Sequence, residues 1–346
     1  MQNLTSKSLL LLYTKIIKIV FNPSIRKIAW EVDTLTTHYF SDLDKSKFIR
    51  PVITVGIFDG VHKGHRYIID QMQRQAVLNA GQTVIITLWP HPRMVLYPGK
   101  EIKLLSTLDE KIELLESSGV DHLVLVPFDK GFAALKANEF IEKVLVEKIG
   151  VQSLLLGFDN HFGNNKEGNY EVVRQASLKY GFELLHPAPL FDGRDSVSST
   201  DIRLYLELGE IEKANHLLGY NYFITGKVVE GQKLGRTLSF PTANIVTDEF
   251  KMLPRVGVYA VKVKTGYGIF NGMLNIGFRP TVDHNSLHKT IEAHLFDFNN
   301  DLYDTIITVT FVARLRDERK FASIDDLRGQ LEKDRTDSIN ILKHIS

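Results

Sequence analysis

Apolar and polar positions form two successive patterns along the chain. Between residues 51 and 190, short apolar runs alternate with longer segments in which apolar side chains recur at helical spacing. Continuous apolar strands between amphipathic helices are typical of a parallel sheet covered by helices on both faces. The pattern predicts strands over 51–58, 83–89, 122–128, 151–159 and 182–190, and helices over 65–81, 107–119, 137–150 and 168–181. Gly81 is expected to cap the first of these helices.

The pattern changes after residue 220, where extended, turn-rich segments follow one another without long helices between them. Such a series is typical of a small antiparallel barrel. The last segment, 323–345, has helical spacing, and Ser323 is expected to cap its start. We therefore predict an N-terminal extension over 1–27, a Rossmann-like α/β domain over 28–205, and an antiparallel β-barrel domain with a C-terminal helix over 206–346.

Composition narrows the classes of protein to consider. The net charge is +1 and no basic stripe occurs, whereas nonspecific nucleic-acid binders carry one, so no nucleic-acid partner is expected. The absence of cysteine excludes disulfides and thiolate metal sites and fits a cytoplasmic protein. The apolar segment 8–21 is interrupted by Lys15 and Lys18 and is too short to span a membrane. We expect it to belong to a poorly ordered extension, and we expect no membrane partner.

The segment "GIFDGVHKGH" (56–65) follows the first predicted strand and starts a helix. Glycines at positions 56, 60 and 64 allow the backbone to turn or a ligand to approach closely. Helix starts attract anions, and the imidazoles of His62 and His65 can donate to phosphate oxygens there. This arrangement suits attack by one phosphate on the α-phosphorus of a nucleoside triphosphate. The alternative is that both histidines only complete the loop and the helix start.

A second candidate phosphate site lies at "SSTDIR" (198–203). Ser198, Ser199 and Thr200 offer hydroxyl groups at a predicted helix start, and Arg203 is expected in the first turn. A cation in the first turn opposes the helix macrodipole and so lowers stability slightly. A triphosphate bound at the helix start makes the contribution of that cation favourable. The simpler interpretation is ordinary capping of the helix.

The segment 231–244, "GQKLGRTLSFPTAN", carries the chemistry of the second half. It is not a Walker loop, because no Gly-Lys-Ser/Thr ends it. Two glycines and two cations in its first part are suited to close over phosphates: Gly231, Lys233, Gly235 and Arg236. Thr242 and Asn244 share one side of an extended segment, and their oxygen atoms suit Mg²⁺. The alternative is a capped turn.

A strand pattern over 290–298 places Ile291, Ala293 and Leu295 on one face and Glu292 and His294 on the other. Glu292 is the general-base candidate, because it can accept a proton from an attacking alcohol. Taken alone, an acidic residue on a strand more often faces solvent.

In chain order, these motifs resemble those of the bacterial bifunctional riboflavin kinase/FMN adenylyltransferase (FAD synthetase) family, over about residues 50–335. The supporting segments include "GIFDGVHKGH", "GFDNHFG", "SSTDIR", "FPTAN", "NIGFRPTV" and "IEAHLFDF". The resemblance implies that the sheet domain converts FMN to FAD and the barrel phosphorylates riboflavin to FMN, each with ATP and Mg²⁺.

The resemblance also implies roles for single residues. His62 and His65 would contact the triphosphate, and the other adenylyltransferase positions would be Gly56, Phe58, Gly64, Asn160, Ser199, Thr200 and Arg203. In the kinase, Thr242 and Asn244 would bind Mg-ATP, and Glu292 would activate the ribityl hydroxyl.

Three positions depart from the family pattern: Ile57, Trp89 and Asn160. All lie in the adenylyltransferase half. They keep open the alternative of a monofunctional riboflavin kinase with a degenerate flavin-binding or regulatory N-terminal domain. The histidine motif alone would also fit a relative of the RNA-linked synthetases. This sequence, however, lacks the lysine-rich second signature expected of such a protein.

Overall fold

The computed structural model describes residues 34–157, 162–163, 167–188, 190–192, 195–231, 238–280 and 287–343. The described chain divides into two compact units. The first comprises residues 34–57, 66–98 and 112–188, and the second comprises 58–65, 99–111 and the described residues from 190 onward. The predicted extension, 1–27, lies outside the described residues.

The first unit contains a parallel sheet of six strands in the order β1-β4-β3-β2-β5-β6. Every neighbouring pair is parallel, as the apolar runs predict. The strands are β1 (Thr36–Tyr39), β2 (Val52–Val55), β3 (Thr83–Trp89), β4 (His122–Pro127), β5 (Ser153–Leu155) and β6 (Glu183–Leu185). In β2, all four side chains are buried, because helices cover both faces of the sheet.

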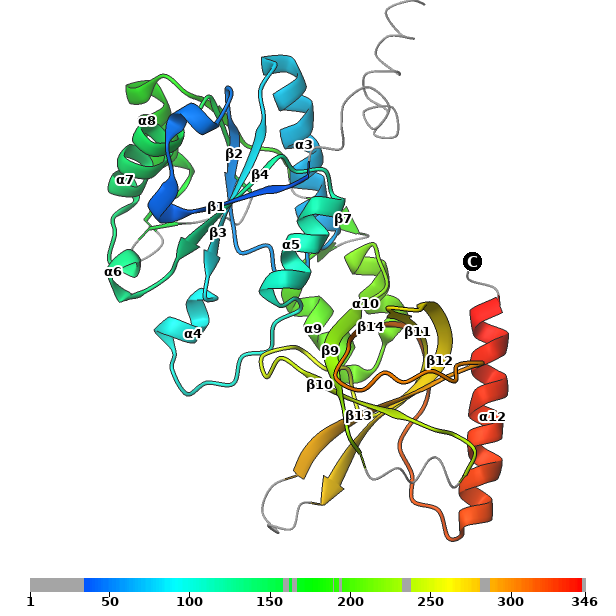
Figure 1. Ribbon diagram of the computed structural model, residues 1–346. Helices are drawn as coiled ribbons and strands as arrows, with labels where there is room; N and C mark the ends of the chain where they lie inside the picture. Colours follow the sequence, from blue (N-terminus) through cyan, green and yellow to red (C-terminus); the bar gives the residue numbers. More distant parts are fainter. Residues whose placement is uncertain are drawn as a thin grey trace, which may run out of the picture. The chain divides into compact units, whose positions relative to one another are not determined.

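Helices and short turns complete the first unit. Figure 1 shows α7 and α8 on one side of the sheet and α3 on the other. The helical elements are η1 (Phe40–Asp42), η2 (Lys45–Lys47), α3 (Lys63–Asn79), α4 (Pro92–Leu96), α5 (Leu108–Ser117), α6 (Lys130–Ala133), α7 (Ala137–Phe140), the π-helical η3 (Ile141–Ile149) and α8 (Tyr170–Tyr180). Both α3 and α5 begin on residues of the second unit.

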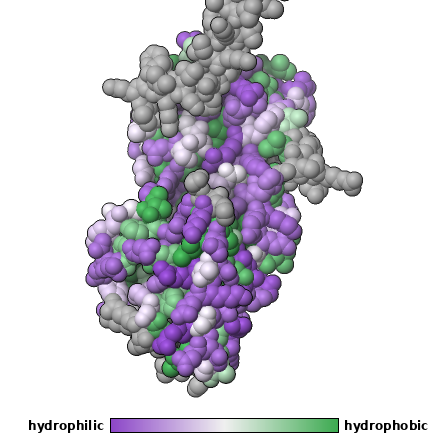
Figure 2. Space-filling view, turned by 90° about the vertical axis from the view of Figure 1, so that its right-hand side faces the viewer, coloured by the Kyte–Doolittle hydropathy of each residue, from purple (hydrophilic) through white to green (hydrophobic). Residues whose placement is uncertain are grey.

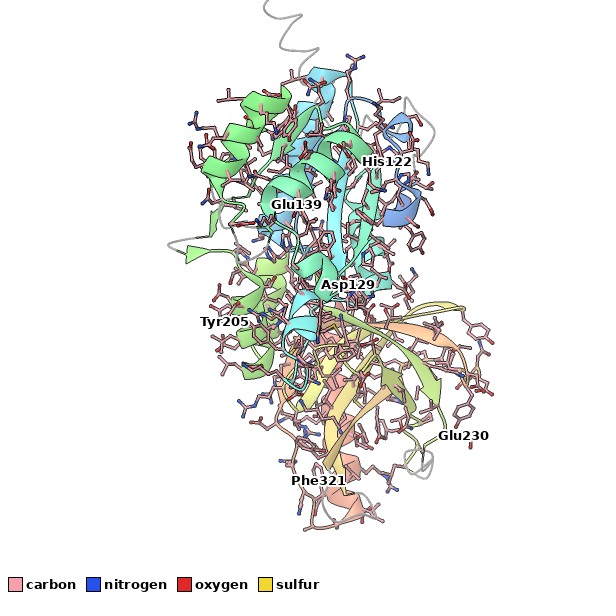
Figure 3. All side chains as sticks on the ribbon, turned by 90° about the vertical axis from the view of Figure 1, so that its left-hand side faces the viewer. His122, Asp129, Glu139, Tyr205, Glu230 and Phe321 are labelled. Carbon is pink, nitrogen blue, oxygen red and sulfur yellow. The ribbon has the colours of Figure 1, made fainter. Side chains whose placement is uncertain are left out.

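Side chains cap several of these helices. Asp129 and Glu139, labelled in Figure 3, accept hydrogen bonds from the backbone nitrogens of Phe132 (2.7 Å) and Lys136 (3.2 Å). Gly81 takes part in the cap of α3, because its backbone nitrogen donates to the Ala76 carbonyl oxygen at 2.8 Å, but it is not the left-handed residue. The helix ends at Asn79, and Ala80 takes the left-handed conformation with φ 45°. A Cβ on Gly81 would lie 2.2 Å from the Arg50 carbonyl oxygen, so close backbone packing requires the glycine.

The second unit contains a closed barrel of six strands in the order β10-β13-β12-β11-β14-β9. All neighbouring pairs are antiparallel, which confirms the predicted barrel. The strands are β9 (Phe223–Val229), β10 (Ala243–Thr247), β11 (Gly257–Thr265), β12 (Gly268–Pro280), β13 (Leu287–Leu295) and β14 (Ile306–Arg316). A two-stranded ribbon, β7 (Phe191–Asp192) and β8 (Asp195–Ser196), precedes them.

The helices that lie wholly within the described part of the second unit are α9 (Ser199–Leu208), α10 (Ile211–Leu218) and α12 (Ile324–Lys343). The C-terminal helix α12, red in Figure 1, packs on β11 and β12. Ser323 caps it as predicted, because its hydroxyl accepts a hydrogen bond from the Asp326 backbone nitrogen at 3.1 Å. The barrel core continues into α9 and α10 through buried residues such as Ile202 and Ala214.

Hydrophilic residues dominate the face of the molecule in Figure 2, and hydrophobic ones lie scattered among them. No helix in the described part of the chain is long and apolar enough to cross a membrane.

Candidate active sites

The first cluster of predicted site residues lies on the loop that joins β2 to α3. His62 immediately precedes α3, and His65 is its third residue. Their rings are stacked, with centroids 3.7 Å apart and an interplanar angle of 21°. The Phe58 ring lies next to His65, with 4.8 Å between centroids. The structure therefore brings together three residues that the sequence places in one candidate site.

Burial keeps both histidines neutral. It lowers the pKa of His62 from the usual 6.5 to about 4, while Asp59 raises that pKa and Arg203 lowers it further. Burial, His62 and Lys111 lower the pKa of His65 well below 6.5. Both Nδ1 atoms are buried and lack a hydrogen-bond partner among the described residues. Two uncharged imidazoles with unused ring nitrogens are thus held at the start of a helix.

The carboxylate of Asp59 fixes the loop that precedes His62. It is buried and accepts hydrogen bonds from the backbone nitrogens of Leu105 (3.1 Å) and Ser106 (3.0 Å). It also forms an ion pair with Arg203. The Ser106 hydroxyl accepts a hydrogen bond from the Gly60 backbone nitrogen at 3.0 Å. The loop is therefore held by contacts on both sides of the Asp59–Gly60 peptide.

Two glycines make this loop possible. Gly60 has φ +79°, and a Cβ there would lie 2.9 Å from the Leu105 Cβ. A Cβ on Gly64 would lie 3.1 Å from the His62 ring and 3.3 Å from the Val197 carbonyl oxygen. A side chain at position 64 would therefore press on the His62 imidazole.

The helix α9 supplies the second part of this cluster. Ser198 caps it, and its hydroxyl accepts from the Asp201 backbone nitrogen at 3.2 Å. The Ser199 hydroxyl donates to the Asp59 carbonyl oxygen at 3.1 Å, whereas Thr200 is exposed. Ser199 thus joins the helix start directly to the histidine loop.

Arg203 lies further along α9 than the sequence suggests. It is the fifth helical residue, beyond the first turn, so the expected opposition to the helix macrodipole does not apply. Its guanidinium donates to the Lys103 carbonyl oxygen at 2.8 Å and the Ser199 carbonyl oxygen at 3.2 Å, and pairs with Asp59. The Asp59 carboxylate therefore balances its charge.

Sequence reasoning missed Asp59 and Lys111. Asp59 stands inside the motif, but its own side chain gave no separate signal. Lys111 is only 2% exposed, and burial lowers its pKa from 10.5 to about 8, although Asp59 raises it. Nothing in the helical pattern of 107–119 distinguishes this lysine from a solvent-exposed one.

One predicted adenylyltransferase residue is not part of this cluster, and another cannot be compared with it. Gly56 belongs to the first unit, where its backbone nitrogen donates to the Ile86 carbonyl oxygen at 3.0 Å and extends the pairing of β2 with β3. Asn160 lies outside the described residues.

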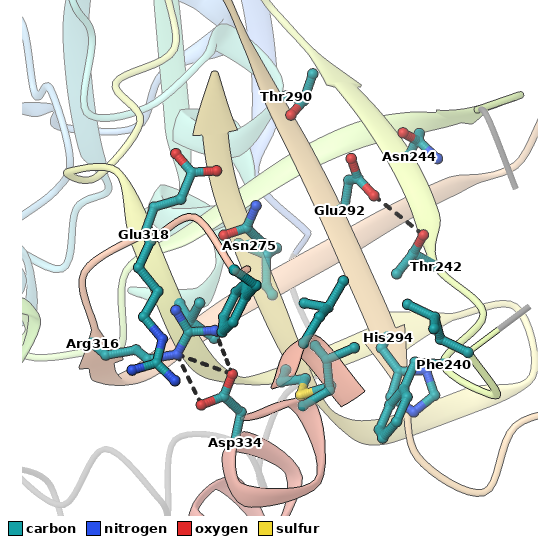
Figure 4. A pocket seen from close by; sticks show the side chains of 18 of the residues that line it. Phe240, Thr242, Asn244, Asn275, Thr290, Glu292, His294, Arg316, Glu318 and Asp334 are labelled. Carbon is teal, nitrogen blue, oxygen red and sulfur yellow. Dashed lines mark hydrogen bonds and ion pairs between the residues drawn. The ribbon is translucent and has the colours of Figure 1, made fainter. Parts of the chain in front are cut away.

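The second cluster lines a cavity of about 380 Å³ beside the barrel (Figure 4). The Thr242 hydroxyl donates to a Glu292 carboxylate oxygen at 3.3 Å. The strand register places Glu292 of β13 opposite Asn244 of β10 and, on its other side, opposite Asn275 of β12. Neighbouring strands thus present a hydroxyl, a carboxylate and two amides close together.

The predicted alternation of β13 is confirmed. Ile291, Ala293 and Leu295 are buried in the barrel core, while Glu292 and His294 line the cavity. The His294 Nδ1 atom lies 2.8 Å from the Pro241 carbonyl oxygen, which orients the ring. Burial lowers the pKa of His294, and this hydrogen bond partly opposes the shift.

Gly231 packs closely against the Asn244 side chain. A Cβ on Gly231 would lie 2.0 Å from the Asn244 Nδ2 atom. The absence of a side chain at position 231 therefore allows Asn244 its position. The other predicted residues of this segment, Lys233, Gly235 and Arg236, lie outside the described residues.

A partly buried ion pair lines the cavity next to α12, with side chains that are 20% exposed for Arg316 and 2% for Asp334. Asp334 of α12 holds the Arg316 guanidinium through three contacts of 3.0, 3.1 and 2.6 Å, drawn as dashed lines in Figure 4. Gln330 donates to the same carboxylate at 2.6 Å. Both members of the pair line the cavity, and no motif in the sequence singles them out.

Comparisons with known proteins assign both halves. The FAD synthetase family model matches residues 44–201, and the riboflavin kinase model matches residues 218–342. The bifunctional riboflavin kinase/FMN adenylyltransferase of Haemophilus influenzae is 39% identical over 82% of this chain and 91% of its own length. The protein of the same name from Bacillus subtilis is 36% identical over 88% of this chain and 96% of its own length.

Solved structures with a similar fold include one that covers most of this chain. A chain named macrolide-efflux protein from Streptococcus pneumoniae has a TM-score of 0.80 and 29% identity, and the match covers 88% of this chain and 99% of that one. Because each half has its own family match, a monofunctional riboflavin kinase is not favoured. The chain belongs to the family of bifunctional riboflavin kinase/FMN adenylyltransferases, and it is an enzyme that carries both activities.

Proposed function

We propose that FMN adenylylation takes place at the stacked imidazoles of His62 and His65, and riboflavin phosphorylation in the cavity beside Glu292. The observation that carries this assignment is that the two clusters share no residue. The described cavity lining comes from barrel strands, the segments next to β10 and β14, and α12, whereas the histidine cluster comes from the loop before α3 and the start of α9.

In the adenylyl transfer, an oxygen of the FMN phosphate attacks the α-phosphorus of ATP. The bond to the β-phosphate oxygen breaks, and pyrophosphate leaves. His62 and His65, as neutral imidazoles, donate N–H groups to phosphate oxygens as negative charge builds up in the transition state. At the start of α9, the Thr200 hydroxyl and the Arg203 guanidinium hold the triphosphate. The Ser199 hydroxyl must turn from the Asp59 carbonyl oxygen to donate to a phosphate.

In the kinase reaction, the ribityl hydroxyl of riboflavin attacks the γ-phosphorus of ATP, and ADP leaves. Glu292 accepts the hydroxyl proton as general base. The Thr242 hydroxyl, which lies 3.3 Å from Glu292, orients this carboxylate and also binds the nucleotide. Asn244 lies opposite Glu292 in the strand register and, with Thr242, binds the nucleotide.

Mg²⁺ fits the kinase cluster because the available donors are oxygens, the ligand type that this ion prefers. Thr242 and Asn244 would hold it together with the nucleotide phosphates. When bound, Mg²⁺ neutralises charge on the transferred phosphoryl group. We place the enzyme in the cytoplasm, in agreement with its lack of cysteine.

The assignment is tested by reciprocal substitutions in the full chain. Glu292→Gln should reduce FMN formation from riboflavin by about 10²–10⁴-fold, the usual contribution of a general base, and leave FAD formation from supplied FMN unchanged. His65→Ala should have the opposite effect. Chromatography of the flavins gives both results. Loss of both activities from either change, in a folded protein, would contradict the assignment.

A further inference from the structure

The barrel binds a segment, residues 99–111, that precedes all the barrel strands in the sequence. The Leu104 backbone nitrogen donates to the Phe250 carbonyl oxygen at 2.7 Å, and the Met252 nitrogen donates to the Leu104 carbonyl oxygen at 2.8 Å. These bonds make a parallel bridge between Leu104 and Lys251, which lies between β10 and β11. Residues 99–111 thereby belong to the same compact unit as the barrel.

A buried ion pair strengthens this attachment. The Lys251 Nζ atom lies 2.5 Å from a Glu110 carboxylate oxygen, and each side chain is 1% exposed. The same ammonium donates to the Leu105 carbonyl oxygen at 2.7 Å and lies 4.6 Å from the centre of the Tyr222 ring. The other Glu110 oxygen accepts from the backbone nitrogen of Thr225 in β9 at 2.9 Å. Two buried charges thus tie the segment to two parts of the barrel.

The opposite side of the same segment holds the histidine loop. The backbone nitrogens of Leu105 and Ser106 donate to the Asp59 carboxylate, and the Ser106 hydroxyl accepts from Gly60. Leu105 therefore takes part in both attachments: its carbonyl oxygen binds Lys251 and its nitrogen binds Asp59. A short series of polar contacts leads from Lys251 to the loop that carries His62.

We propose that Lys251, paired with Glu110, is a positioning residue for FMN adenylylation. It holds residues 104–106 in place, and these hold Asp59 and its partner Arg203, which set the position of the His62 loop. The inference rests on the proposed location of adenylyl transfer at His62 and His65. Lys251 lies within the riboflavin kinase match, 218–342, and would therefore be necessary for FMN adenylylation, the reaction of the other half.

The kinase reaction supplies an internal comparison. Neither Lys251 nor Glu110 is among the residues that line the cavity beside Glu292. A displacement of 104–106 therefore changes the surroundings of His62 without a direct change in those of Glu292. A role in stability alone would affect both activities alike.

The test compares variants of the full chain. Lys251→Met leaves the Glu110 carboxylate buried without its partner, so the double variant Glu110→Gln, Lys251→Met, which removes both charges, is measured beside it. Lys227→Met is the control, because it removes an exposed pair with Asp304 whose side chains are 51% and 86% exposed. Values of kcat and of KM for ATP are measured separately for FMN formation and for FAD formation from supplied FMN.

We expect the double variant to fold and to phosphorylate riboflavin with wild-type kcat and KM. Its kcat/KM for ATP in FAD formation should fall by at least about tenfold, since small misplacements of catalytic groups have effects of this size or larger. The control should retain both activities. Unchanged FAD formation in the double variant, or a parallel loss of both activities in the two variants, whether folded or not, would overturn the proposal.

His65→Ala separates this inference from the proposed function. If His65→Ala retains FAD formation, the location of the adenylyltransferase site is wrong, whatever Lys251 does. If His65→Ala loses FAD formation while the double variant keeps it, the site stands and the positioning role of Lys251 is wrong.

Discussion

The two histidines of "GIFDGVHKGH" are neutral because the fold removes them from water. His62 is only 5% exposed, and its ring stacks on that of His65. A second positive charge in such a pair would be both desolvated and repelled. The site therefore offers hydrogen-bond donors without fixed positive charge, while Arg203 and Lys111 supply the cationic side chains nearby.

The lowered pKa of His62 makes stability depend on pH. The unfolded chain takes up a proton on this residue as the pH falls through 6.5, whereas the folded chain does so only near 4. Stability is therefore lost as the pH falls across this window, by about 3 kcal/mol for this group. Urea unfolding at several pH values should show a smaller loss for His62→Gln than for the wild type. If the free energy of unfolding falls equally with pH in the two proteins, the lowered pKa of His62 is contradicted.

Substitution of Gly231 tests the placement of Asn244. A Cβ at this position would lie 2.0 Å from the Asn244 amide, so Gly231→Ala must displace that side chain. We expect kcat/KM for ATP in riboflavin phosphorylation to fall by up to about a hundredfold, with FAD formation from FMN unchanged. Gly266→Ala is the matched control, because a Cβ there meets no atom within 4 Å. Wild-type kinase kinetics for Gly231→Ala would exclude a role for Asn244.

At the scale of elements, most helices and strands follow from the periodicity of the sequence. The strand β3 has the predicted bounds, and the alternation of β13 places Glu292 and His294 in the cavity. Long-range contacts are what the periodicity does not contain. At the end of α3, a Cβ on Gly81 would lie 2.2 Å from the Arg50 carbonyl oxygen, and no local pattern predicts that contact.

Two helix caps of the same design allow the start of α9 to be tested. Ser198 accepts from the Asp201 backbone nitrogen at 3.2 Å, and Ser323 accepts from that of Asp326 at 3.1 Å. Replacing either serine with alanine should lower the free energy of unfolding by about 1 kcal/mol. Only Ser198→Ala should slow FAD formation, because α9 carries Ser199 and Arg203. Equal kinetics in the two variants would place the triphosphate elsewhere.

At the scale of the whole molecule, the order of the motifs predicts two activities, and the family matches confirm them. The boundary predicted at residues 205/206 stays a prediction. The sequence does not predict that residues 58–65 and 99–111 group with the barrel. It depends on Glu110, Lys251 and Asp59, which in sequence look like ordinary charged residues. Only the folded chain shows that they are buried and paired.

With the two sites placed as proposed, two impaired variants should complement each other. The His65→Ala variant should convert riboflavin to FMN and stop there, while Glu292→Gln should form FMN at least about a hundredfold more slowly than the wild type. FMN released by the first variant is then a substrate for the second. The control is each variant alone at the same total protein concentration.

The most direct test of two separate active sites is therefore FAD formation from riboflavin, ATP and Mg²⁺ by a mixture of His65→Ala and Glu292→Gln. We expect the mixture to form FAD far faster than either variant alone. A mixture of folded variants that forms no FAD, or a His65→Ala variant that forms no FMN, would contradict the claim that the chain carries two independent active sites.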